Sequence, residues 1–96
     1  MTRQELIEKL RELGPELQAR FGARGLALFG SFARGEANPG SDVDLLVDFD
    51  DDATLFELGG LGAFLEERLP FKVDIVPRRA LRAEIRDSVL QEAVAL

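Results

Sequence analysis

Two apolar runs separated by a helical stretch constrain the fold of this chain more than any other feature. The runs are DVDLLVDF (42–49) and FKVDIV (71–76), and both have the length and the composition of buried strands. The residues between them carry leucines at helical spacing, from an expected N-cap at Asp52 to about residue 68. A strand–helix–strand crossover places its two strands parallel in one sheet. The sequence therefore predicts an α/β fold.

Helices and one further strand are expected around this crossover. The opening TRQELIEKLREL predicts an amphipathic helix with a capping box of Thr2 and Glu5, which Gly14-Pro15 should kink or split. GLALF (25–29) predicts a short buried strand, and the chain from Arg78 onward predicts a terminal helix. The expected buried faces are Leu6, Leu10, Leu13 and Leu17 in the first helix, Leu55, Leu58, Leu65 and Leu69 in the second, and Leu81, Ile85 and Val89 in the last. We expect one domain over residues 1–96, with a small mixed sheet of about three strands flanked by helices.

Composition narrows the chemistry of the chain. Its 96 residues include no Cys and no His, so a metal site must be built from oxygen ligands, which favours Mg²⁺, Mn²⁺ or Ca²⁺. No apolar stretch reaches the length of a bilayer span and no leader opens the chain, so we expect a cytoplasmic protein. The net charge of −6 argues against direct nucleic-acid binding, although bound cations would reverse the local sign at a nucleotide site.

Three aspartates lie in the two strand-like runs. Asp42 and Asp44 point to the same side because side chains alternate along a strand, and Asp74 can lie beside them if the strands pair in parallel. Such carboxylates repel one another unless cations lie between them, and two divalent ions form the usual clamp for phosphoryl displacement. We expect Asp42 and Asp44 to hold the metal that grips a triphosphate, and Asp74 to complete a second metal site and help deprotonate the attacking hydroxyl. Solvated strand-end charges are the alternative interpretation, and it has most force for Asp74.

A glycine-containing loop precedes the aspartate pair. Gly30 would let the backbone approach a phosphate closely, and Ser31 offers a hydroxyl donor and a possible N-cap for a turn through FARG. Exposed N–H groups at such a turn bind anions. Arg34 could add donors to the phosphates, or it could form a surface ion pair with Glu36 or Glu16.

Other residues near these motifs also have two interpretations. Phe32 could stack on a base or anchor the loop in the core, and the second is favoured. Asp48 lies too far along the strand from Asp44 for direct ligation, and it is interpreted as solvated. A set of arginines near the C-terminus is interpreted as a solvated helix face in preference to a surface that contacts a toxin or RNA. Its members are Arg78, Arg79, Arg82 and Arg86.

The spacing of these motifs resembles that of a known family. Gly30-Ser31, ten residues, Asp42-x-Asp44 and a later Asp74 in VDIV are similar to the pattern of the minimal nucleotidyltransferases, compact members of the DNA polymerase β-like superfamily. The resemblance implies the polymerase β-like fold, contacts from Gly30 and Ser31 to nucleotide phosphates, and a metal-binding catalytic triad of the three aspartates. It also implies a nucleoside triphosphate donor, most often ATP. With the oxygen-only ligands, we expect two Mg²⁺ ions.

The resemblance also implies a partner. Many small proteins of this kind are antitoxins that silence an HEPN-domain ribonuclease toxin by transferring AMP to one of its tyrosines. This chain has no Tyr and no room for an additional domain to hold an acceptor, so both features favour transfer to another macromolecule. The first hypothesis is therefore Mg²⁺-dependent transfer of AMP from ATP to a hydroxyl of an HEPN-type toxin. The alternative is a non-catalytic antitoxin that blocks its partner by binding and keeps a vestigial nucleotide site. Transfer to tRNA or to a small molecule fits the motif but not the short acidic chain.

Overall fold

A computed structural model describes all 96 residues. The chain forms one four-stranded sheet in the order β3-β2-β1-β4, with helices on both sides. In chain order the elements are α1 (Arg3–Phe21), β1 (Ala23–Phe29), α2 (Gly30–Arg34), β2 (Val43–Phe49), α3 (Leu55–Arg68), β3 (Val73–Pro77), the 3-10 turn η1 (Arg78–Ala80), α4 (Ala83–Glu92) and β4 (Val94–Ala95). Strands β2 and β3 are parallel, and β1 is antiparallel to both β2 and β4. The α/β class, the mixed sheet and the parallel crossover are confirmed, with one strand more than expected.

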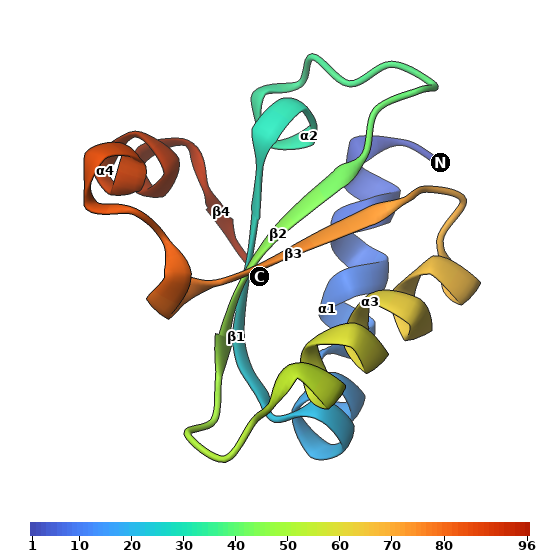
Figure 1. The fold of residues 1–96 in the computed structure, drawn as a ribbon. Helices are drawn as coiled ribbons and strands as arrows, with labels where there is room; N and C mark the ends of the chain where they lie inside the picture. The colour runs from blue at the N-terminus through green and yellow to red at the C-terminus, as the bar shows by residue number, and fades with distance from the viewer.

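The two faces of the sheet differ in how they are covered. Figure 1 shows α1 and α3 on one side and α4 on the other. Val43, Leu45 and Val47 of β2 have no exposed surface and pack into the core beneath α1 and α3. The opposite face carries Leu46 and buries little, because the main apolar cluster lies on the side of α1 and α3. Alternation along β2 therefore turns Asp44 toward the less covered face.

Helix α1 begins as its sequence predicts. The Thr2 hydroxyl accepts from the Glu5 backbone N–H, and the Glu5 carboxylate accepts from the Thr2 N–H, which completes the capping box. The predicted split at Pro15 is wrong, since the helix continues through it to Phe21. Pro15 lies on the exposed side, where water can satisfy the carbonyl that loses its donor. All four leucines of the predicted face are buried, namely Leu6, Leu10, Leu13 and Leu17.

Helix α3 starts two residues later than expected. Its N-cap is Thr54 and not Asp52, and Glu57 completes a second capping box. The first helical residue, Leu55, is 83% exposed, so its predicted place in the core is wrong. The buried face instead centres on Leu61, Phe64 and Leu65. Leu65 and Leu69 are buried as expected, and Leu58 is partly buried.

The C-terminal segment is not one helix. Leu81 is buried but lies before α4, while Ile85 is 49% exposed and α4 has no buried residue, so the predicted buried face is wrong. The last residues form β4, in which Val94 pairs with Leu28, and the Leu96 N–H donates to the Leu26 carbonyl at 2.9 Å. This pairing satisfies backbone groups on the free edge of β1. None of the helices has the length and apolarity needed to cross a bilayer.

Candidate active site

The register between β2 and β3 brings two of the predicted acids together. Asp44 lies directly opposite Asp74 in the parallel pair, and the flanking positions match Val43 with Val73. Because Val43 and Val73 both point into the core, the two aspartates share the less covered face of the sheet. Asp42 is exposed just before β2 begins, two residues from Asp44. Asp74 thus lies beside Asp44, as predicted.

Partial burial and neighbouring carboxylates both act on the charge of Asp44 in this corner. The pKa of Asp44 is raised above its ordinary value, first by partial burial and then by the negative charges of Asp74 and Asp42. A hydrogen bond with Asp74 raises this pKa further, while the guanidinium of Arg34 opposes the shift. The ionised form of Asp44 is therefore destabilised relative to the same carboxylate in water.

The three aspartates do not form a ready metal site in this arrangement. No group of three Asp, Glu, His or Cys side chains lies where it could hold a metal ion. Asp44 lies opposite Asp74, and the charge of Asp42 also acts on Asp44. Carboxylate oxygens are the donors that Mg²⁺ prefers, so the chemistry of the set fits that ion. The metal-binding role of Asp42, Asp44 and Asp74 stays a prediction.

Gly30 joins β1 directly to α2 and lies against Asp44. Its φ is +73°, and a Cβ at this position would overlap Oδ2 of Asp44, so only glycine fits here without strain. The N-cap of α2 is Phe29 and not Ser31, which lies inside the helix, so the predicted cap is wrong. Phe32 is buried and packs edge-on against Phe71, with 4.9 Å between ring centroids. Phe32 therefore anchors the loop, as favoured.

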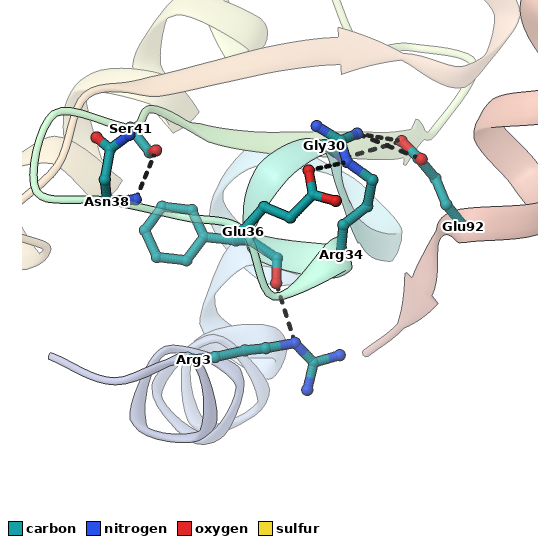
Figure 2. Close-up of polar contacts among 8 residues, drawn as sticks. Arg3, Gly30, Arg34, Glu36, Asn38, Ser41 and Glu92 are labelled. Atoms are coloured by element: carbon teal, nitrogen blue, oxygen red, sulfur yellow. Dashed lines mark hydrogen bonds and ion pairs between the residues drawn. The ribbon is translucent and has the colours of Figure 1, made fainter.

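Arg34 lies beside this turn and is held by two carboxylates (Figure 2). Its Nε donates to Glu36 at 3.1 Å and its Nη1 donates to Glu92 at 3.2 Å, and these bonds raise the pKa of the guanidinium. The predicted ion pair with Glu36 is confirmed, whereas Glu16 instead pairs with Arg20. Glu92 also accepts a hydrogen bond from the Gly30 N–H at 3.2 Å.

The segment between α2 and β2 is a compact turn that leads into Asp42. The Asn38 N–H donates to the Ser41 hydroxyl at 3.0 Å, and the Gly40 N–H donates to the Asn38 side chain at 2.9 Å (Figure 2 shows the first). Further along β2, Asp48 pairs with Arg24 at 3.3 Å and takes no part in the acidic corner.

Comparison with known proteins assigns this arrangement to a family. A family model described as "Nucleotidyltransferase domain" matches residues 4–96. The chain belongs to this family. It is 40% identical over 94 residues to the protein adenylyltransferase MntA of Thermococcus cleftensis. The alignment covers 98% of this chain and 95% of that protein. The chain is therefore a nucleotidyltransferase.

Solved structures support the same fold. One assigned as a minimal nucleotidyltransferase is 44% identical and superposes with a TM-score of 0.86, covering 100% of this chain and 97% of that one. A toxin–antitoxin crystal structure with AMP-PNP matches with a TM-score of 0.70, 99% coverage of this chain and 72% of that one. At 23% identity, the second match shows the fold alone.

Glu92 is the residue of this nucleotidyltransferase site that the sequence did not predict. It lies 62 residues beyond Gly30 and belongs to no recognisable motif. Its neighbours in the chain predicted only a terminal helix. The contact depends on where α4 packs relative to the sheet and α2. A local sequence pattern does not predict that placement.

Proposed function

We propose that this nucleotidyltransferase transfers AMP from ATP to a tyrosine hydroxyl of an HEPN-type toxin and so acts as its antitoxin, with Mg²⁺ as cofactor. The observation that carries the proposal is the direct pairing of Asp44 with Asp74 beside the Gly30 turn. This pairing gathers carboxylates for cations and N–H donors for phosphates in one corner of the sheet. A relative that carries the name protein adenylyltransferase and matches nearly the whole chain supports the same reaction.

Each residue of the site has a separate role in this reaction. The Gly30 N–H, the Ser31 hydroxyl and the Arg34 guanidinium bind oxygens of the triphosphate. Asp42 and Asp44 would hold Mg²⁺, which would neutralise charge on the phosphates and polarise the α-phosphorus. Asp74 completes the metal-binding set.

The transfer step itself forms one bond and breaks another. The tyrosine oxygen forms a bond to the α-phosphorus, and the bond between that phosphorus and the β-phosphate oxygen breaks. Pyrophosphate leaves, and a carboxylate of the acidic corner, assigned to Asp74, accepts the hydroxyl proton. Because the chain contains no Tyr, the acceptor has to come from another molecule.

The test is transfer of label from ATP to the product of the neighbouring gene. Purified protein is incubated with that product, labelled ATP and Mg²⁺, and the modified residue is located by peptide mass spectrometry. Label on a tyrosine is expected with the wild type and with Asp48→Asn, a matched control on the same strand whose side chain pairs with Arg24. Asp42→Asn should abolish it. Equal labelling by Asp42→Asn and Asp48→Asn would contradict the proposal.

The second candidate function is neutralisation of the partner by binding alone. The double variant Asp42→Asn, Asp44→Asn separates the two functions. Loss of both labelling and neutralisation supports the enzyme. Full neutralisation of the partner by this variant, together with no labelling by the wild type, supports the binding module.

A further inference from the structure

The carboxylate of Glu92 accepts hydrogen bonds from two of the donors that the proposed function assigns to the triphosphate. Its Oε1 accepts hydrogen bonds from the Gly30 N–H and from Nη1 of Arg34, both at 3.2 Å, and its Oε2 lies 3.3 Å from the same Nη1. Figure 2 shows the backbone of α2 and the Arg34 side chain converging on this one group. A backbone N–H and a guanidinium are also the donors that bind a phosphate oxygen.

We propose that Glu92 is an intramolecular competitor for the triphosphate and that α4 must withdraw it before nucleotide binds. The inference rests on the proposed function, because it takes Gly30 and Arg34 as phosphate ligands. One N–H cannot donate fully to a carboxylate and to a phosphate together, and two anions in contact repel. Nucleotide therefore binds the arrangement in which Glu92 has left, and its apparent affinity is the intrinsic affinity multiplied by the fraction of molecules in that arrangement.

The packing of α4 permits such a movement. The helix has no buried residue, so its withdrawal opens little of the core. One residue in extended conformation lies at each end of the helix, namely Arg82 (φ −66°, ψ 140°) before it and Ala93 (φ −66°, ψ 138°) after it. The segment stays attached through buried Leu81 before the helix and through the pairing of β4 with β1 after it. Movement of α4 thus requires neither unfolding of the sheet nor loss of its anchors.

Removal of the Glu92 charge should leave Arg34 in place. Arg34 keeps its second partner, Glu36, at 3.1 Å from Nε, so the guanidinium stays near the turn when Glu92 is neutral or absent. The competing interpretation is that Glu92 positions Arg34 for the phosphate. That interpretation predicts the opposite effect of substitution, because loss of Glu92 would then weaken nucleotide binding.

The experiment is titration calorimetry of the full chain with Mg–ATP, and with tripolyphosphate in EDTA as a metal-free probe. The variants are Glu92→Gln, which keeps the shape of the side chain, Glu92→Ala, which removes the acceptor, and Glu84→Gln as control. Glu84 lies on the same helix, is exposed and makes no ion pair, so its substitution changes the net charge equally. We expect Kd for both probes to fall about five- to tenfold in Glu92→Gln, at least as far in Glu92→Ala, and to stay at the wild-type value in Glu84→Gln. Melting curves establish that each variant is folded.

The outcomes distinguish failure of this inference from failure of the proposed function. Unchanged or weaker binding by Glu92→Gln overturns the competitor role, even if label transfer to the partner succeeds. Tighter binding of tripolyphosphate by Glu92→Gln supports that role, even if no label is transferred to any partner. Absence of binding to every variant at millimolar Mg–ATP and tripolyphosphate overturns both, because a site freed of its competitor should then bind.

Discussion

Replacement of Gly30 by alanine can separate backbone strain from displacement of an active-site carboxylate. Gly30 and Gly35 lie at the two ends of α2, and each has φ +73°. A Cβ on Gly35 would meet nothing within 4 Å, whereas a Cβ on Gly30 would overlap Oδ2 of Asp44 and lie 3.1 Å from its Cγ. The two glycines are therefore a matched pair with the same conformation and only one added contact.

The expected magnitudes follow from these two environments. Alanine in the left-handed conformation costs about 1–2 kcal/mol, so Gly35→Ala should lower the free energy of unfolding by that amount. Gly30→Ala carries the same cost, and it also forces the Asp44 carboxylate away from its rotamer, at about 0.5–1.5 kcal/mol more. The effect on function is larger, because displacement of a reacting group by about 1 Å can cost ~100-fold in rate. We expect about that loss for Gly30→Ala, and a rate within about threefold of wild type for Gly35→Ala.

Two measurements check this prediction. Urea denaturation gives the free energy of unfolding, and the initial rate of label transfer to the partner gives the activity. In an Asp44→Ala background the overlap with Oδ2 is absent and only a 3.3 Å contact with the Cβ of residue 44 is left, so Gly30→Ala should then cost about as much stability as Gly35→Ala. Equal stability and equal rates for the two glycine variants in the wild-type background would refute the reasoning, since the contact with Asp44 would have no consequence.

Three further predictions concern other parts of the structure. Asp44→Asn should raise the melting temperature in EDTA, because it removes one of two facing carboxylates, and it should abolish stabilisation by Mg–ATP. A lower melting temperature of this variant in EDTA would contradict repulsion between Asp44 and Asp74. Thr54→Ala should lower the free energy of unfolding by about 1 kcal/mol near neutral pH. The Thr54 hydroxyl lowers the pKa of Glu57 below its ordinary value, so the part of this effect that involves the Glu57 carboxylate is present above the ordinary pKa and is lost as the pH falls through the lowered pKa. A cost undiminished in acid urea titrations would argue against the capping box. Leu61→Ala should lower the free energy of unfolding by about 2–5 kcal/mol, and Leu55→Ala by less than about 0.5 kcal/mol. Similar urea midpoints for the two variants would contradict the assignment of Leu61 to the buried face of α3.

Much of the local structure could be predicted because it depends on neighbours in the chain. The capping box of Thr2 and Glu5 involves residues three apart, and the apolar pattern of β2 fixes which of its side chains face the core. The start of α3 was predictable too, since Thr54 and Glu57 repeat the spacing of Thr2 and Glu5. Asp52 has no such partner, because the residue three positions later is Leu55.

The C-terminal segment could not be predicted in the same way. The spacing of Leu81, Ile85 and Val89 fits a buried helical face, but burial requires a surface that is free to receive it. Here α1 and α3 already cover one side of the sheet, and the free edge of β1 pairs with Val94–Ala95 instead. Which segment packs on the sheet therefore depends on the assembled fold and not on the sequence of that segment alone.

The sequence by itself determined that Asp42 and Asp44 share a side of their strand and that this strand lies parallel to the one that carries Asp74, because alternation and crossover geometry are local properties of the backbone. Only the tertiary structure decided that Asp44 faces Asp74 in register and that Glu92 reaches Gly30. Register is fixed by how the apolar side chains of two strands fit one core, and the contact of Glu92 depends on the path of a distant helix. Both are set by packing between segments that the chain brings together only when it folds.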